Sequence, residues 1–178
     1  QQALLEDYCS DHSLELVSAE EPGDREVLWE MRRSISPSLA RVAITKINED
    51  VSLPLGRLSR AVSTIHSAAT RHGLDCYVFG HCGDGNLHVN IMTDRRRREE
   101  IRRAKAFVRE LFEETVAMGG TLSGEHGIGM TKSEYLGMLF SEVEMSVQPG
   151  TSHTMDPAGT MNPGKYFDGV PGGQGVGA

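Results

Sequence analysis

The sequence predicts an α+β fold in which helices cover a mostly antiparallel sheet. Three observations support this class. Short β-branched runs alternate with helical patterns up to about residue 118. Two of these runs are separated only by Asp84-Gly85, a pair typical of β-hairpin turns. The resulting order, β-α-β-α-β-β-α, places one hairpin among strands that helices separate. With 178 residues, the chain has room for one sizeable domain.

The N-terminal part is expected to contain a strand and a helix. The run LELVSA, residues 14–19, predicts a short strand. Asp24 is a suitable N-cap for a helix over REVLWEMRRSIS, because its side chain can accept hydrogen bonds from the first turn. Pro37 is expected to limit or kink this helix, since proline lacks a backbone donor and clashes with the preceding turn.

The segment VAITKINEDVSLP predicts a second strand. Its β-branched residues favour an extended backbone. Because successive side chains of a strand point to opposite faces, Lys46 and Asp50 are expected on the face opposite to Ile47.

Two amphipathic helices are predicted on either side of the hairpin. The first covers about residues 54–72, and Gly73 is expected to end it in a left-handed conformation. The second covers about residues 95–118. Its basic run, RRRREEIRRAK, is interrupted by acids and followed by apolar residues at helical spacing. A solvated helix face is therefore a better interpretation than a nucleic-acid surface.

The stretch VFGHCGDGNLHVNIM, residues 78–92, places two histidines around the predicted turn. If Asp84-Gly85 is a two-residue loop, His81 lies directly opposite His88. Directly opposed residues share one face of a sheet, with Cβ atoms about 4.5 to 5.5 Å apart, so both rings could reach a common ion or substrate. Asn90 is expected on that face. The other face is expected to pack under the helices through Leu87, Val89 and Ile91.

A glycine-rich loop, GGTLSGEHGIG, carries Glu125 and His126. Glycines allow the backbone to approach a ligand closely. Two histidines and one carboxylate form the ligand set of a catalytic zinc or ferrous site, although the spacing is not the helical H-E-x-x-H of metalloproteases. A single histidine is more often a hydrogen-bonded or surface side chain, and the acid in this loop disfavours phosphate binding. The two pairs together favour a metal site over these alternatives.

Composition narrows the function classes. The net charge of −7 disfavours nucleic-acid binding, and no apolar run approaches the length of a membrane span. Three cysteines at irregular spacings argue against a disulfide framework and for a reducing compartment, so we expect a cytoplasmic protein. We expect the chain, which begins with Gln1 rather than Met, to be part of a larger polypeptide.

Three motifs together resemble the C-terminal region of the FAD-linked oxidases that include D-lactate dehydrogenase, D-2-hydroxyglutarate dehydrogenase and the flavin subunit of glycolate oxidase. The motifs are GHCGDGNLHVNI, GGTLSGEHGIGMTKSEYL and DPAGTMNPGKYF. LWEMRRSISPSLA and KINEDVSLPLGRL resemble two further blocks of that family, so the resemblance covers roughly residues 14–167. In this family an N-terminal domain binds FAD, and a C-terminal cap domain with an antiparallel sheet supplies substrate and metal residues.

The resemblance implies a role for each matching residue. The implied cofactors are FAD and a divalent metal, with zinc preferred. His126 would be the base that takes the proton of the substrate hydroxyl, and Asn162 would lie near the flavin. The implied metal ligands are His81, His88 and Glu125. The residues implied to hold the substrate are Arg32, Ser36, Lys46 and Asn90.

We expect a cap and substrate-binding domain over residues 1–167, followed by a disordered glycine-rich tail over residues 168–178, with the FAD-binding domain absent from the chain. Where the family has a helix before its last motif, Pro149-Gly150 is expected to interrupt it.

The leading function is the C-terminal domain of a flavin-dependent 2-hydroxy-acid dehydrogenase of the glycolate, D-lactate or D-2-hydroxyglutarate type, inactive without its flavin domain. A free-standing metal- or small-acid-binding module is the alternative. The expected partners are the hydroxy acid, the FAD-binding domain, an electron acceptor that the sequence does not identify and a second copy in a homodimer. Neither nucleic acid nor a membrane span is expected.

Overall fold

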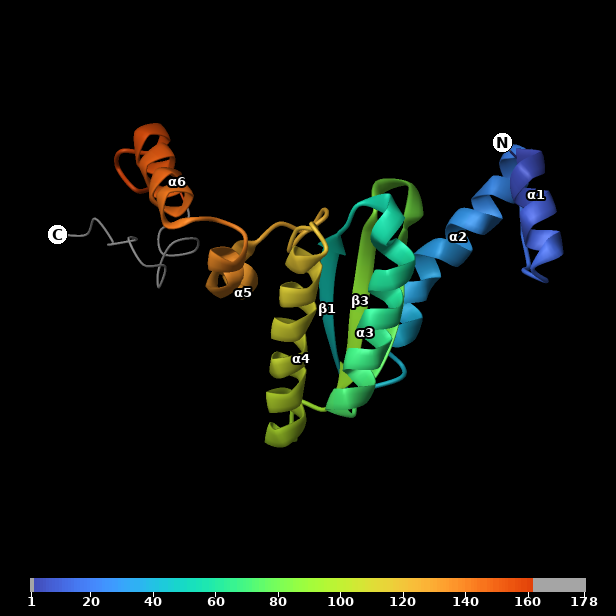
Figure 1. Cartoon of the computed structure of the whole chain (residues 1–178), viewed down its shortest axis with the longest axis horizontal. Coiled ribbons are helices and arrows are strands. Elements are labelled where there is room, and N and C mark those ends of the chain that lie inside the picture. Colours follow the sequence, from blue (N-terminus) through green and yellow to red (C-terminus); the bar gives the residue numbers. More distant parts are fainter. Residues whose placement is uncertain (1, 162–178) are drawn as a thin grey trace. The chain divides into compact units, whose positions relative to one another are not determined.

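The computed structural model describes residues 2–161 (Figure 1). The chain divides into two compact units, Gln1–Val42 and Ala43–Ala178. Among the described residues, no helix has the length and apolar character needed to cross a membrane. Two predicted features, the disordered tail over residues 168–178 and the flavin contact of Asn162, lie outside the described residues.

The first unit contains two helices, α1 (Gln2–Asp11) and α2 (Pro22–Leu39). The strand predicted over residues 14–19 is wrong, since this segment forms no strand and its apolar side chains are exposed. A β-strand needs a neighbouring strand that forms hydrogen bonds with its backbone N–H and C=O groups. Within residues 2–161, no strand pairs with residues 14–19. The helix α1 was not predicted.

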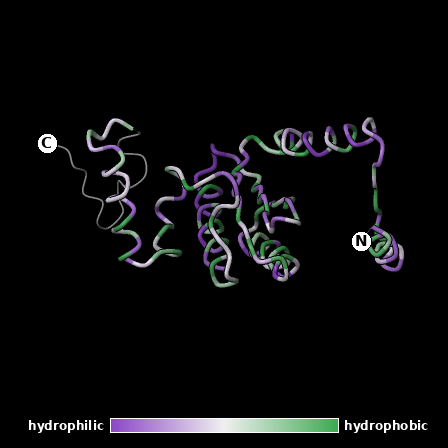
Figure 2. Tube along the Cα trace, turned by 90° about the horizontal axis from the view of Figure 1, so that it is seen from above, coloured by the Kyte–Doolittle hydropathy of each residue, from purple (hydrophilic) through white to green (hydrophobic). Residues whose placement is uncertain are grey.

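The second helix begins at Pro22, a residue that suits the first turn because its missing N–H has no helical partner there. The predicted N-cap at Asp24 is wrong: Glu21 is the N-cap, and Asp24 lies in the first turn, where its charge still favours the helix N-terminus. Pro37 lies inside the helix, which continues through it and ends two residues later at Leu39. Hydrophobic and hydrophilic residues alternate along the helices, as the colours of Figure 2 show.

The second unit contains a three-stranded antiparallel sheet, which confirms the predicted α+β class. Its strands are β1 (Thr45–Ser52), β2 (Asp75–His81) and β3 (Asn86–Thr93), in the spatial order β1-β3-β2. The strand β3 is therefore central and pairs with both neighbours. A 3-10 turn (Leu55–Arg57) connects β1 to the helix α3.

Two helices, α3 (Leu58–His72) and α4 (Arg98–Ala117), cover one face of this sheet (Figure 1). As predicted, α3 ends at Gly73 in the left-handed conformation, with φ of 61°. The N-terminal arginines of α4 are exposed, which confirms the solvated helix face. The core between the helices and the sheet is built from apolar side chains of both layers, among them Val51, Ile65, Leu87, Val89, Ile91, Phe107, Leu111 and Phe112.

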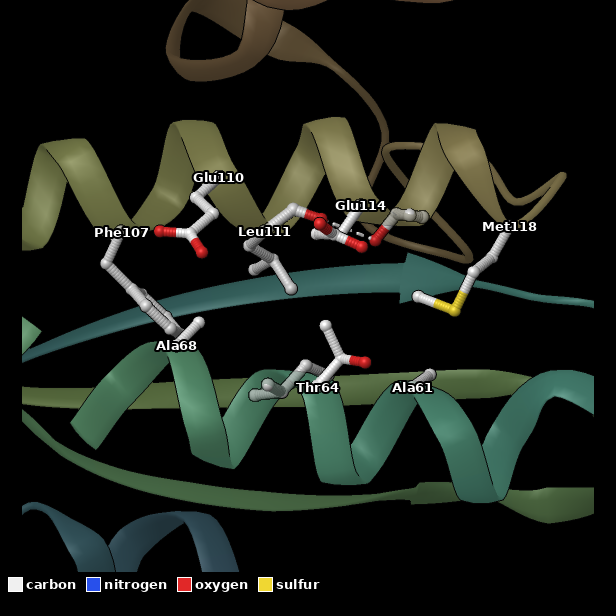
Figure 3. Close-up of a pocket in the computed structure, with 10 residues that line it drawn as sticks. Ala61, Thr64, Ala68, Phe107, Glu110, Leu111, Glu114 and Met118 are labelled. Carbon is white, nitrogen blue, oxygen red and sulfur yellow. Dashed lines mark hydrogen bonds between the residues drawn. The ribbon is translucent and has the colours of Figure 1, made fainter. Parts of the chain in front are cut away.

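Small residues allow α3 and α4 to pack closely. Figure 3 shows Ala68 beneath Phe107, and Ala61 facing Met118, across the contact between the two helices. The space left between them is about 10 Å³, close to the minimum that one water molecule needs. The helical layer is therefore a packed support for the sheet and leaves the opposite sheet face to carry polar residues.

Short helical segments follow α4. They are α5 (Gly129–Lys132), a 3-10 turn (Ser133–Met138) and α6 (Glu142–Met155). The predicted interruption at Pro149-Gly150 is wrong, because α6 continues through both residues. A capping box fixes its first turn: Ser141 Oγ accepts the N–H of Glu144, and the Glu144 carboxylate accepts the N–H of Ser141.

The hairpin differs from its predicted register by two residues. His81 pairs with Asn86, and His88 pairs with Phe79, so the prediction that His81 lies directly opposite His88 is wrong. The cause is a longer loop, in which Cys82–Asp84 forms a 3-10 turn and Gly85 adopts φ of 71°. Because side chains alternate with a period of two, the shift keeps both histidines on one face. The expectation of a shared face that includes Asn90 is therefore confirmed.

Gly85 provides a test of this loop. Alanine at this position should lower the free energy of unfolding by about 2 kcal/mol, because left-handed backbone costs an L residue about 1–2 kcal/mol and a Cβ would lie 2.1 Å from the Leu53 carbonyl oxygen. The melting temperature should fall by roughly 4 to 8 °C, measured by circular dichroism with a chelator present. Gly83→Ala is the matched control, because a Cβ at Gly83 meets nothing within 4 Å. Equal melting temperatures for the two variants would contradict this loop geometry.

Candidate metal and acid-base site

The sheet face that points away from α3 and α4 carries a cluster of polar side chains. In the register of the sheet, His88 of β3 lies between Asp50 of β1 and Phe79 of β2. His81 is two residues further along β2, opposite Asn86. These positions share one face because they are directly paired or two residues apart. The sheet thus supplies two imidazoles and one carboxylate to the same small area.

The histidines meet a carboxylate from a distant part of the sequence. The ring centroids of His81 and His88 are 5.3 Å apart in an edge-to-face arrangement. Glu125 Oε1 lies 3.0 Å from Nε2 of His88 and 3.8 Å from Nε2 of His81. One ligand atom from each of these three residues lies within 4.8 Å of the other two. The structure therefore brings together the three residues that the sequence analysis assigned to a metal.

His126 borders this cluster and contacts His88, Glu125 and Asp50. Its ring stacks on that of His88 at 5.3 Å between centroids and 25° between planes. Its Nε2 lies 3.8 Å from Glu125 Oε1, and its Nδ1 lies 3.4 Å from Asp50 Oδ1. An imidazole in this position can exchange a proton with a molecule bound beside Glu125, because it borders the ligand cluster without being one of its three members.

The loop that carries Glu125 and His126 is attached to the end of β1. Thr121 forms an isolated antiparallel bridge with Ser52, through hydrogen bonds of 2.8 and 3.2 Å between their backbones. The preceding residue, Gly120, approaches so closely that a Cβ would lie 2.5 Å from the Ser52 carbonyl oxygen. The glycine therefore lets the chain turn from α4 directly onto the sheet, next to the hairpin.

The carboxylate of Asp50 holds the backbone of this loop. Three successive N–H groups, those of Gly124, Glu125 and His126, donate to Asp50 Oδ2 at 2.8, 2.7 and 3.0 Å. The hydroxyl of Ser123 also donates to this carboxylate, at 3.1 Å to Oδ2, and accepts the N–H of Gly127. Successive N–H groups that converge in this way form a concave anion-binding arrangement. Here a side chain of the same chain occupies it.

Lys132 of α5 neutralises Asp50. Its Nζ donates to Asp50 Oδ1 at 2.6 Å, to the Asp50 carbonyl oxygen at 3.0 Å and to the Leu122 carbonyl oxygen at 2.8 Å. An ammonium group has three protons, and each has an acceptor here. Both side chains are almost completely buried. Glu49 adds a longer contact, with Oε2 at 3.6 Å from the ammonium.

The electrostatics follow from these contacts. Burial by itself would raise the pKa of Asp50, but the N–H groups of Glu125 and His126 and the Lys132 ammonium together hold that pKa well below its ordinary range. Glu49 shows the opposite result: burial raises its pKa, and the attraction of Lys132 offsets this only in part. The two adjacent acids therefore differ in environment, and only Asp50 accepts hydrogen bonds from the backbone of the loop.

Two asparagines of β3 complete the face. Asn86 packs against the loop, and a Cβ on Gly124 would lie 2.3 Å from Asn86 Oδ1, so a larger residue at this position would displace the Asn86 side chain. Asn90 is fully buried, and its amide nitrogen donates weakly to two backbone carbonyls. Within residues 2–161, the side-chain oxygens of both asparagines have no hydrogen-bond partner. Buried acceptors without a partner are costly and are often found where a ligand or ion binds.

The remaining predicted substrate residues fall into two groups. Lys46 pairs with Met92 and lies four residues from Asp50 on β1, so it shares the polar face. Arg32 and Ser36 lie one helical turn apart on α2, and so on one side of that helix. They belong to the first unit, whereas the histidine cluster belongs to the second.

The sequence analysis missed the supporting residues. Asp50 was placed on the correct face, but it was not recognised as the anchor of the loop, and Lys132 and Asn86 were not singled out. One signal was available for Asp50, because two adjacent acids interrupt a run that otherwise favours a buried strand. No comparable signal marks Lys132, whose ammonium group contacts Asp50 and Leu122 in the folded chain.

Comparison with known proteins identifies the family. Residues 1–166 match the family described as FAD linked oxidases, C-terminal domain. The chain is 37% identical over 140 residues to glycolate oxidase subunit GlcD of Bacillus subtilis, covering 79% of this chain and 30% of that protein. It is 35% identical over 144 residues to D-2-hydroxyglutarate dehydrogenase of Stutzerimonas stutzeri, covering 79% and 31%.

A third relative comes from a vertebrate. The chain is 30% identical over 152 residues to a probable mitochondrial D-lactate dehydrogenase of Danio rerio, covering 84% of this chain and 31% of that protein. The chain thus spans about a third of the length of these relatives. The family match extends over nearly the whole chain and includes the histidine cluster and the glycine loop. The chain therefore belongs to the C-terminal domain family of the FAD-linked oxidases.

Proposed function

We propose that residues 1–167 are the cap and substrate-binding domain of an FAD-dependent 2-hydroxy-acid dehydrogenase, and that His81, His88 and Glu125 hold a divalent metal that binds the substrate. The observation that carries the proposal is the convergence of these three side chains, whose ligand atoms lie within 4.8 Å of one another. The names of the relatives support this class, since they include a glycolate oxidase subunit, a D-2-hydroxyglutarate dehydrogenase and a D-lactate dehydrogenase.

The geometry of the three side chains suits zinc. Two ligands of a tetrahedral zinc ion, each at about 2.0–2.1 Å from the metal, are separated by about 3.3–3.4 Å. The distances from Glu125 Oε1 to the two imidazoles, 3.0 and 3.8 Å, lie on either side of that value. The His88 side chain is 5% exposed and that of Glu125 is 50% exposed, so the site is anchored on one side and open on the other. Three protein ligands with an open side are typical of catalytic rather than structural zinc.

In the proposed reaction the metal, His126 and FAD have separate roles. A divalent metal at this site would lower the pKa of a hydroxyl group bound to it. His126 would then accept the hydroxyl proton at Nε2, since this atom lies 3.8 Å from the Glu125 carboxylate and thus faces the ligand cluster. FAD, bound mainly by another domain, would accept the hydride, and Asn162 is proposed to lie near it.

The substrate class follows from charge. An anionic hydroxy acid needs cationic or amide partners in a protein whose net charge is −7. We assign Arg32, Ser36, Lys46 and Asn90 to this task. Asn90 lies two residues from His88 on β3 and on the same face of the sheet, which supports its assignment.

The free-standing binding module is disfavoured, because the family match covers residues 1–166. The three cysteines are unpaired, which agrees with a reducing compartment, and we propose the cytoplasm. That the enzyme passes electrons to a further acceptor and that the chain forms a homodimer remain predictions.

Metal content tests the ligand set. After dialysis against zinc and then metal-free buffer, the wild-type chain should retain about one equivalent, as measured by inductively coupled plasma mass spectrometry. His88→Ala and Glu125→Ala each remove one of only three protein ligands. Their affinities should fall by more than the 10–100-fold typical of losing an outer-shell partner.

His66→Ala is the matched control, because His66 is an exposed histidine of α3, on the helical side of the sheet. It should retain as much zinc as the wild type. If His88→Ala and Glu125→Ala remain folded and also retain wild-type zinc, the ligand assignment is wrong.

The division of cofactors between domains gives a second test. The purified chain should bind no FAD, because FAD is assigned mainly to a domain outside this chain. The protein should be colourless, and the supernatant after denaturation should lack the yellow absorption of released flavin. A stoichiometric amount of flavin in that supernatant would refute the assignment.

A further inference from the structure

The loop Ser123–Gly127 carries both Glu125 and His126, yet most of its residues are exposed. An exposed loop of glycine and polar residues has little apolar contact to hold it in one conformation. The N–H groups of residues 124–126 and the hydroxyl of Ser123 all donate to one side chain of the sheet, Asp50, which is fully buried. The placement of the acid and the base thus depends on this carboxylate.

We propose that Asp50 is the positioning residue of the site, and that Lys132 is the counter-charge that pairs with the buried Asp50 carboxylate. This inference rests on the proposed metal function and extends it to residues outside the ligand set. The carboxylate fixes the N–H groups of residues 124–126 at 2.7–3.0 Å. It thereby fixes the direction in which the side chains of Glu125 and His126 leave the backbone, toward the two histidines of the hairpin.

The buried ion pair is difficult to explain by stability alone. Removing two charges from water costs about as much as their attraction returns, so apolar residues of similar volume often stabilise a protein equally well. A charged acceptor differs from an apolar residue in its directional bonds to several donors at once. Asp50 accepts from three N–H groups of the loop, a hydroxyl and the Lys132 ammonium, and an apolar side chain could accept from none of them.

Asp50 also faces the imidazole of His126. Its Oδ1 lies 3.4 Å from Nδ1, whereas Nε2 of the same ring lies toward Glu125. A carboxylate beside one ring nitrogen favours the tautomer with the proton on that nitrogen, which leaves the other as an acceptor. Asp50 therefore directs the free electron pair of His126 toward the side where the substrate would bind.

The test uses two double variants of the 178-residue chain. Asp50→Leu alone would leave Lys132 buried without its main counter-charge and could prevent folding, so it is combined with Lys132→Met. Asp50→Leu/Lys132→Met keeps the approximate volume and removes every acceptor. Asp50→Asn/Lys132→Met also removes both charges but keeps one side-chain oxygen that can accept from the loop. Glu49→Gln is the control, because Glu49 is the neighbouring buried acid and contacts Lys132 but none of the loop N–H groups.

The first measurement is Co²⁺ affinity, from the visible absorption of Co²⁺ titrated into the metal-free chain. We expect about 10–100-fold weaker binding for the Leu/Met variant, a smaller loss for the Asn/Met variant, and wild-type affinity for Glu49→Gln. Wild-type affinity in the Leu/Met variant, or equal losses in the two double variants, would overturn the assignment.

The second measurement needs no metal and so separates this inference from the proposed function. Amide hydrogen exchange, followed by NMR in the metal-free chain, should become faster by about tenfold or more at residues 124–126 in the Leu/Met variant, the effect of losing a hydrogen bond to a charged group. Amides of β3 should keep their wild-type rates, which shows that the sheet is intact. If the wild type binds no Co²⁺, the metal proposal fails, and unchanged exchange at residues 124–126 in the variant would overturn the positioning role as well.

Discussion

The carboxylate of Asp50 joins two parts of the chain that are more than 70 residues apart in sequence. Its backbone belongs to β1, where it is paired with His88, and its oxygens bind the backbone of the loop that carries Glu125 and His126. Without this contact the sheet would still present its two histidines. The acid and the base, however, would lie on a loop with little to hold it. The candidate site therefore depends on one buried charge and on Lys132, which makes that charge tolerable in the interior.

The rest of the second unit supports this arrangement. The helices α3 and α4 pack closely and occupy one face of the sheet, so the main apolar core lies on that side. The other face can therefore carry polar side chains. Because side chains along a strand alternate between the two faces, each of the three strands contributes polar residues to this face. The bridge between Thr121 and Ser52 then brings the chain back from α4 to the end of β1 that lies beside the hairpin. Each step is local, and together they bring His81, His88 and Glu125 within reach of one ion.

Some elements of the fold could be predicted from the sequence and others could not. The α+β class, the C-terminal end of α3 and the common face of His81, His88 and Asn90 were all predicted, because alternation and helix-ending glycines are local signals. The hairpin register was wrong by two residues, since Asp84-Gly85 also suits a longer loop. The two histidines still lie on one face because a register shift of two residues does not change the face to which a side chain points. The strand over residues 14–19 and the helix break at Pro149 were wrong, because pairing partners and helix caps outweighed local propensity.

Burial of polar groups was the part that could not be predicted. Asp50 and Lys132 are ordinary charged residues in the sequence, and charged residues are normally exposed. Only the path of the loop across β1 shows that both lie in the interior with every donor and acceptor paired. The resemblance of the motifs to a known family implied roles for the motif residues, whereas the residues that hold the motifs in place became visible only in three dimensions.

Zinc K-edge X-ray absorption of the zinc-loaded chain would identify the atoms that bind the metal. We expect two imidazole ligands, with nitrogen at about 2.0–2.1 Å, oxygen ligands from Glu125 and solvent at a similar distance, and no sulfur. The exposed thiol of Cys82 is an alternative zinc ligand, since Cys82 follows His81 directly in the chain. A sulfur ligand at about 2.3 Å, or a spectrum with fewer than two imidazoles, would contradict the assignment of His81, His88 and Glu125.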